Sequence, residues 1–183
     1  RLNAQIERNN LFFSKKRKFD SINVAHFTLK DISETYLSWL NNSQYLQFSD
    51  QQFFSHTRNS SEEYLLSFKK SPNLFLKFSE NHLSIIGTST IYIDFLHDTA
   101  NVGVLIDPKL SGKGLGAMCW DIVINQICPA IGIRKVSAGS VENNLAMIKL
   151  FERSGMVLEA RLKGEKIYRG KAYDVVIFSK FCD

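Results

Sequence analysis

Residues 101–116 read NVGVLIDPKLSGKGLG: an apolar run, a proline, a glycine-rich turn and the start of an apolar helix. A strand that delivers such a turn to a helix N-terminus gathers backbone N–H donors at one point, where the helix dipole also favours negative charge. Gly112, Gly114 and Gly116 carry no Cβ, so the turn can take positive φ and approach a pyrophosphate closely. The pattern predicts a phosphate-bearing ligand, with an ordinary glycine-rich loop as the alternative.

Two nucleotide-binding motifs fit this turn poorly. A mononucleotide loop needs GxxxxGK[ST], but Lys113 lies between two glycines and no GKS or GKT follows. A dinucleotide loop needs GxGxxG, and the spacing here is GxGxG. The turn therefore favours another phosphate-bearing ligand, such as an acyl-CoA.

A second motif follows the turn after one predicted helix and one predicted strand. SGKGLGA and the downstream ENNLAMIKLFERSGM together resemble the GNAT superfamily of acetyl-CoA-dependent N-acetyltransferases, over about residues 23–181 and closest to the ribosomal-protein and amino-sugar subgroup. In the family loop, Arg or Gln is followed by two residues, Gly, one residue and Gly or Ala; Ser111 stands in the first position here. The second family motif, N-x5-L-Y-E-x2-G-F, is matched by Asn144, Leu150, Phe151, Glu152, Gly155 and Met156.

The resemblance implies an α+β fold with three layers. We expect a mixed, twisted sheet of about six to seven strands, about four flanking helices and a V-shaped cleft between two parallel central strands. Alternation and turn signals place strands at 23–29, 74–78, 83–95, 102–106, 135–140, 157–163 and 173–181. Capping and stop signals place helices after Asp31 or Ser33, from the capping box of Ser60 with Glu63, at 115–127 ending at Pro129, and at 144–154.

Charge divides the chain into a basic N-terminal extension, residues 1–20, and a single domain, residues 21–183. The extension carries six basic and two acidic side chains, so it holds most of the net charge of +5. The remainder is close to neutral, which argues against a nucleic-acid partner. We expect the KKRK run to lie in a solvated tail or helix end, with a polyanion-binding arm as the alternative, while Leu11, Phe12 and Phe13 suggest docking.

Composition also limits location. No apolar run reaches the roughly 18 residues of a membrane span. Three cysteines do not make a disulfide framework, and the four histidines show no metal-ligand spacing, so we expect a cytoplasmic protein with no metal. The sequence leaves the oligomeric state open between monomer and homodimer.

The resemblance implies acetyl-CoA as co-substrate and assigns its contacts by position. Leu105 and Ile106 would meet the pantetheine arm, and Asn144 would meet a pantetheine amide. From the residues alone, a core strand and a helix N-cap are the alternatives. The diphosphate would lie on the turn formed by Ser111, Gly112, Lys113, Gly114, Leu115, Gly116 and Ala117.

Two family positions that handle protons have changed: Asn101 stands where relatives often have Glu, and Phe151 replaces the usual Tyr. A neutral amine must attack the thioester, which calls for a base or a water chain. Ser140 and Glu142 are our first candidates, because they follow the strand expected to line the cleft. Surface polar residues are the alternative, and the further candidates are Tyr92, Tyr168, His97 and Asp98.

The acceptor amine depends on the first half of the chain. SWLNNSQY and FSHTRNSSEEYLLSF resemble, more loosely, GNAT members that acetylate amino sugars on nucleotide carriers, and His56 and Arg58 would suit the carrier phosphates. A protein N-terminus, a small metabolite amine and an antibiotic amine are the alternatives. A degenerate module that binds acyl-CoA without catalysis is the alternative from a different class.

Overall fold

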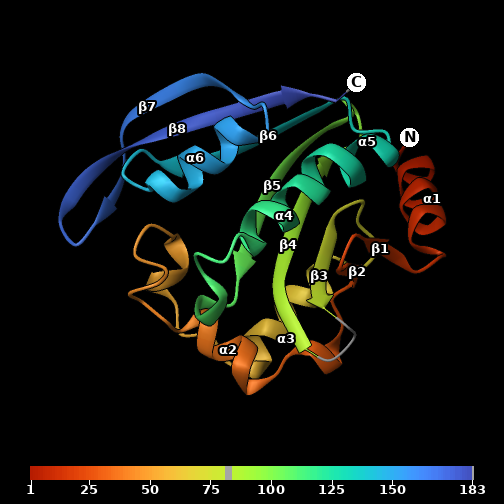
Figure 1. Cartoon of the computed structure of the whole chain (residues 1–183), viewed down its shortest axis with the longest axis horizontal. Helices are drawn as coiled ribbons and strands as arrows, with labels where there is room; N and C mark the ends of the chain where they lie inside the picture. The colour runs from red at the N-terminus through yellow and green to blue at the C-terminus, as the bar shows by residue number, and fades with distance from the viewer. Residues whose placement is uncertain (81–83, 183) are drawn as a thin grey trace.

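One eight-stranded sheet forms the centre of the computed structural model, which describes residues 1–80 and 84–182 (Figure 1). Its strand order is β1-β2-β3-β4-β5-β6-β8-β7, and among the described strands only β5 and β6 are parallel neighbours. The α+β class is confirmed, with eight strands where six to seven were expected. The strands are β1 (Arg17–Phe19), β2 (Ile22–His26), β3 (Leu74–Glu80), β4 (Ser84–Asp94), β5 (Thr99–Ile106), β6 (Lys135–Val141), β7 (Val157–Tyr168) and β8 (Lys171–Phe181).

Helices cover both faces of this sheet, because alternate strand residues such as Phe75 and Leu76 point to opposite faces. One face packs under the run that begins with α4, and the other under α2 and α3, where Phe27, Tyr36 and Trp39 join Phe75. The helices are α1 (Leu2–Phe13), α2 (Glu34–Leu40), α3 (Arg58–Ser67), α4 (Leu115–Asp121), the π-helical η4 (Ile122–Ile127), α5 (Cys128–Ala130) and α6 (Leu145–Arg153). Short 3-10 turns are η1 (Leu29–Asp31), η2 (Asp50–Phe53) and η3 (Pro108–Leu110).

The start of α3 differs from the predicted one. Thr57 is the N-cap: its Oγ1 accepts from the Ser60 N–H at 3.2 Å, and Ser60 Oγ accepts from the Thr57 N–H at 3.0 Å. The predicted capping box of Ser60 with Glu63 is therefore wrong, because a reciprocal cap one turn earlier satisfies the first helical donors. The strand predicted from residue 83 starts outside the described residues, and its described part begins at Ser84.

The helix predicted at 115–127, ending at Pro129, continues through the proline to Ala130. Just before the proline, the Cys128 N–H bonds to the Val123 carbonyl, which is the wider spacing of a π turn. A proline in an α-helix clashes with the carbonyl four residues earlier, and the wider turn accommodates its ring.

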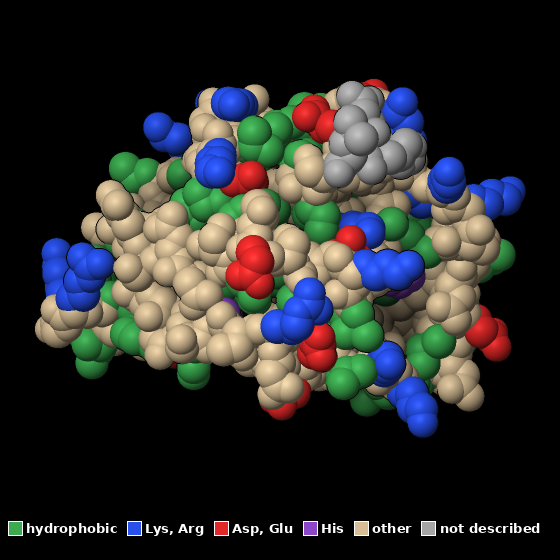
Figure 2. All heavy atoms as spheres, turned by 90° about the horizontal axis from the view of Figure 1, so that it is seen from below, with side chains coloured by type: hydrophobic (Ala, Val, Ile, Leu, Met, Phe, Trp, Pro, Cys, Tyr) green, Lys and Arg blue, Asp and Glu red, His purple; other side chains and the backbone are tan. Residues whose placement is uncertain are grey.

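Residues 1–20 belong to the packed structure: Phe12 and Phe13 pack against the main core, and the KKRK run follows directly after the end of α1, as a helix end. In α1, the buried Gln5 donates through Nε2 to the Ile131 carbonyl at 3.0 Å, and the buried Asn9 donates through Nδ2 to the Pro72 carbonyl at 2.8 Å. The segment then adds β1 to the edge of the sheet beside β2. On the face shown in Figure 2, basic side chains are interspersed with acidic ones rather than gathered into one patch. Within the described ranges, no helix is long and apolar enough to cross a membrane.

Candidate active site

The two central strands separate and open a cleft. β5 and β6 pair only from Thr99 with Lys135 to Asn101 with Ser137, although both strands continue beyond these residues. Each keeps its other neighbour, β4 for β5 and β8 for β6, so the diverging edges stay held in the sheet. The predicted V-shaped opening is confirmed. It belongs to a cleft of about 1320 Å³, larger than the roughly 300–1,000 Å³ of an ordinary ligand pocket and large enough for two substrates.

The glycine turn lies at the N-terminus of α4. Gly112 and Gly114 have φ values of 79° and 81°, and a Cβ built on either would meet no atom within 4 Å. No described residue accepts a hydrogen bond from the N–H groups of Gly112, Gly114 or residues 115–117, whereas the Lys113 N–H lies 3.4 Å from the Leu110 carbonyl oxygen. The turn thus offers open space and unpaired donors at a helix N-terminus, which suits a diphosphate.

On the other wall, Asn144 is the N-cap of α6. Its Oδ1 accepts from the Met147 N–H at 3.5 Å, and its side chain lines the cleft. Capping uses only the oxygen, and no described residue accepts from Nδ2. The amide N–H₂ therefore remains available to donate to a ligand while the oxygen caps the helix.

The sequence profile of the acetyltransferase (GNAT) domain family matches residues 22–157, which is more than half of the chain. The chain belongs to the GNAT acetyltransferase family. Members of this family are acetyl-CoA-dependent N-acetyltransferases.

Individual relatives agree with this assignment. One curated relative is YwnH of Bacillus subtilis strain 168, named provisionally as a phosphinothricin acetyltransferase; it is 33% identical over 82 residues, 45% of this chain and 50% of YwnH. The chain thus spans about half the length of that relative. Two solved structures share the fold. One is a chimera of the spermidine N-acetyltransferase SpeG of Vibrio cholerae and hSSAT, with 16% identity, 88% of this chain and 96% of that chain covered, and a TM-score of 0.79. The other is yncA of Salmonella typhimurium with its cofactor acetyl-CoA, with 18% identity, 90% of this chain and 95% of that chain covered, and a TM-score of 0.71.

Several predicted site residues of this GNAT chain are brought together. They come from β4, β5 and β6 and from the loops before α3, α4 and α6, and all line the one cleft. These residues are Tyr92, Leu105, Ser140, His56, Ser111 and Asn144.

Other predicted residues lie elsewhere. Ile106 is 7% exposed in the main core, and the rest of the glycine turn lies at the α4 N-terminus. Glu142 is not part of the cleft lining, since it forms an ion pair with Arg161. Arg58 is also absent from the lining, because its guanidinium donates to the Ile32 carbonyl at 2.6 Å and pairs with Glu62 at 3.2 Å. The structure therefore does not place Glu142 or Arg58 with the other candidates.

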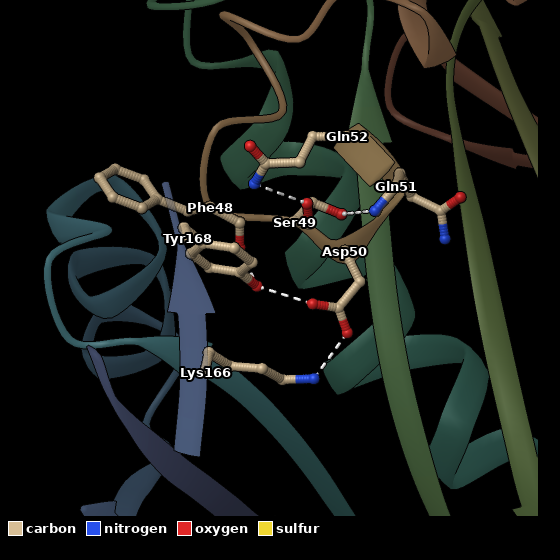
Figure 3. A network of polar contacts seen from close by, with 7 residues as sticks. All are labelled: Phe48, Ser49, Asp50, Gln51, Gln52, Lys166 and Tyr168. Carbon is tan, nitrogen blue, oxygen red and sulfur yellow. Dashed lines mark hydrogen bonds and ion pairs between the residues drawn. The ribbon is translucent and has the colours of Figure 1, made fainter. Parts of the chain in front are cut away.

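Of the polar cluster shown in Figure 3, sequence reasoning named Tyr168 but missed Asp50 and Lys166. Asp50 is the first residue of η2, in the connection before α3; it pairs with Lys166 of β7 at 2.6 Å and accepts from the Tyr168 hydroxyl at 2.9 Å. All three residues line the cleft. They join this connection to the β7–β8 hairpin across more than 100 residues of sequence, so no local motif could have indicated the contact. We call these three residues the Asp50 clasp.

The clasp favours an ionised Asp50. Partial burial opposes the charge, but hydrogen bonds from Lys166 and Tyr168 outweigh it and lower the pKa of the Asp50 carboxyl below its usual value. Burial, followed by the contact with Asp50, raises the pKa of Tyr168. The phenol therefore stays protonated and donates a hydrogen bond to the carboxylate. The connection before α3 is thus held to the hairpin by a charged hydrogen-bonded pair and a phenol.

Proposed function

We propose that the acceptor is an amino sugar whose primary amine takes the acetyl group directly from acetyl-CoA. Asp50 and Lys166 are the acidic and basic side chains in the described cleft lining besides His56, and they neutralise each other. Hydroxyl and aromatic groups make up much of the remaining acceptor side, including Tyr36, Tyr45, Tyr64, Tyr92, Tyr168, Ser60, Thr88 and Thr90. This nearly neutral, hydroxyl-rich lining carries the proposal, because it suits a polyhydroxylated acceptor better than a polyanion or a polycation.

The prediction of a nucleotide carrier receives less support. His56 lines the cleft, with Nε2 at 3.1 Å from the Gln51 carbonyl oxygen. Arg58, the predicted partner for carrier phosphates, points away into its contact with Ile32. The Asp50 clasp also joins two walls of the acceptor side, which favours a compact acceptor over an extended peptide. Free and nucleotide-linked amino sugars therefore both belong in the test.

The chain's own groups fit acetyl-CoA, which supplies an acetyl group activated as a thioester. The free N–H groups around Gly112 and Gly114 would hold the diphosphate, and the absence of Cβ atoms there leaves it room. The Leu105 backbone would hold the pantetheine arm, and Asn144 Nδ2 would donate to one of its amides. These contacts fix the thioester near the separation of β5 and β6.

Proton transfer is left to few groups. Asn101, at the last pair before the strands separate, cannot act as a base, and Phe151 is fully buried against Trp120 with no proton to give. Among the predicted proton-handling residues, Ser140, Tyr92 and Tyr168 line the cleft, and the Tyr168 hydroxyl already donates to Asp50. We propose Ser140 as a hydrogen-bonding relay to water.

The buried cysteines support direct transfer without an acyl-enzyme. Cys119 and Cys128 are fully buried and do not line the cleft. Burial, with a smaller contribution from Glu80, raises the pKa of the Cys119 thiol to about 12, and burial also raises the pKa of Cys128. Neither thiol is therefore a reactive thiolate at neutral pH.

Two measurements test the proposal. Isothermal titration with acetyl-CoA should show micromolar binding, and a free-thiol assay should show the fastest turnover with an amino sugar among free amino sugars, nucleotide-linked amino sugars, peptides and polyamines. Preference for a peptide would support the N-terminal acetyltransferase alternative. Binding of acetyl-CoA with no turnover on any amine would support the non-catalytic module.

A further inference from the structure

Two tyrosine hydroxyls are in contact on the acceptor side of the cleft, the side that includes α3, β4 and the connection before α3. Tyr64 of α3 and Tyr92 of β4 place their Oη atoms 2.6 Å apart, and both residues line the cleft. Their exposed fractions are 40% and 42%, so part of each ring is open to a ligand. Phe68 packs with ring centroids 5.2 Å from Tyr64 and 5.7 Å from Tyr92, and Phe75 lies 5.5 Å from Tyr64. The aromatic layer behind the pair holds its geometry.

The pair has one unused proton. Two phenols carry two hydroxyl protons, and the contact between them uses one of these as the donor. No other described residue bonds to either hydroxyl, so the second O–H is free to donate and its oxygen lone pairs are free to accept. A ligand hydroxyl, which both donates and accepts, matches this combination.

The pair lies beside the expected point of reaction. Tyr92 is the cross-strand partner of Asn101, which is the last β5 residue paired with β6 before the strands separate. Side chains of directly opposite residues share a sheet face, with Cβ atoms about 4.5–5.5 Å apart. On the same face, Gly103 lies opposite Thr90. Because Gly103 has no side chain, the cleft surface is recessed between Asn101 and Leu105. A ring against the two phenols would thus have its substituents within reach of the thioester.

We propose that the Tyr64–Tyr92 pair binds the hydroxylated ring of the acceptor. The exposed parts of the tyrosine rings pack on the apolar face of the sugar, and the free phenolic O–H donates to a ring hydroxyl. This inference rests on the proposed function, because it specifies how the amino sugar is held. It assigns Tyr92 to acceptor recognition rather than proton transfer.

The test uses the double variant Tyr64→Phe with Tyr92→Phe, which removes both hydroxyls and keeps both rings. Glucosamine and cyclohexylamine are matched probes, since both carry an amine on a six-membered ring and only glucosamine has ring hydroxyls. We expect the KM for glucosamine to rise about fivefold to tenfold, the loss of one or two hydrogen bonds, with kcat and acetyl-CoA affinity unchanged. The KM for cyclohexylamine should not change. Tyr173→Phe, which removes a phenol outside the cleft lining, is the matched control.

Saturation-transfer NMR of N-acetylglucosamine, the expected product, separates this inference from the proposed function. Binding that is about fivefold to tenfold weaker in the double variant than in the wild type supports the pair as a ring site, even if no amine in the assay is acetylated. If the wild type acetylates glucosamine and the double variant has the same KM, the inference is wrong and the proposed function stands. If kcat falls equally for every amine, Tyr92 acts in proton transfer and the inference is wrong. Absence of sugar binding to the wild type would also overturn the inference.

Discussion

Asp50→Asn is the most informative test of how the cleft is held together. The substitution keeps the size of the side chain and an oxygen that can accept from Tyr168, but it removes the charge that faces Lys166. Because the Asp50 clasp fastens the connection before α3 to the β7–β8 hairpin, its weakening should loosen the acceptor side of the cleft. The glycine turn is on different elements, so acetyl-CoA binding should be unaffected.

The size of the effect follows from distance and exposure. Unit charges 2.6 Å apart attract by about 1.6 kcal/mol at the dielectric constant of water. The two side chains are 38% and 48% exposed, so solvent, salt and side-chain entropy reduce the gain to about 0.2–1 kcal/mol. At the upper end, the acceptor KM would rise about fivefold. The melting temperature would fall by about 2–4 °C for a chain of this size.

Steady-state kinetics with each substrate varied in turn measures the KM for the acceptor and for acetyl-CoA. A double-mutant cycle with Lys166→Met measures the coupling between Asp50 and Lys166. Once Asp50 is neutral, Lys166→Met should add little further loss. Glu159→Gln is the matched control, because Glu159 is on the same hairpin and its ion pair, with Lys135 of β6, lies outside the cleft. An unchanged acceptor KM in Asp50→Asn, or equal weakening of both substrates, would refute the role of the clasp.

The clasp also has a defined pH dependence. The pKa of Asp50 is lowered in the folded protein, so its contribution to the free energy of unfolding is fully present above the unfolded pKa of about 3.9. That contribution is lost as the pH falls through the folded pKa. The stability difference between wild type and Asp50→Asn should therefore be constant near neutral pH and shrink below about pH 4, which urea unfolding at several pH values would measure.

Three further predictions address the cofactor and catalytic residues. Gly114→Glu should weaken acetyl-CoA binding in isothermal titration by more than about tenfold, because it places a negative charge in the phosphate site. Gly170→Glu is the control: Gly170 has a similar φ of 74° and equally open surroundings, so acetyl-CoA binding should not change. Equal affinities in the two variants would argue against the turn as the diphosphate site. Asn144→Ala and Ser33→Ala both remove an N-cap and should each cost about 1 kcal/mol in thermal unfolding, but only Asn144→Ala should also reduce acetyl-CoA affinity. Glu142→Gln should keep kcat/KM within about twofold because its carboxylate is paired outside the cleft, and a fall of about 10² or more would restore it as a catalytic candidate.

The sequence by itself determined the features that depend on neighbouring residues. The turn with Gly112 and Gly114 needs positive φ and open space, and glycine provides both wherever the turn lies in the fold. Asn144 caps its helix through a contact three residues away. Alternating and helical periodicities likewise located most of the elements, because each reports which side of one segment is buried.

Only the tertiary structure decided which separated segments meet. The Asp50 clasp and the Tyr64–Tyr92 pair join residues from different elements, and α1 is held through buried amides to distant carbonyls. Strand register and helix packing place these side chains within a few ångströms, and no local pattern contains that information. Glu142 and Arg58 lie outside the cleft lining for the same reason. Their partners, Arg161 and the Ile32 carbonyl, are far from them in the sequence and come next to them only in the folded chain.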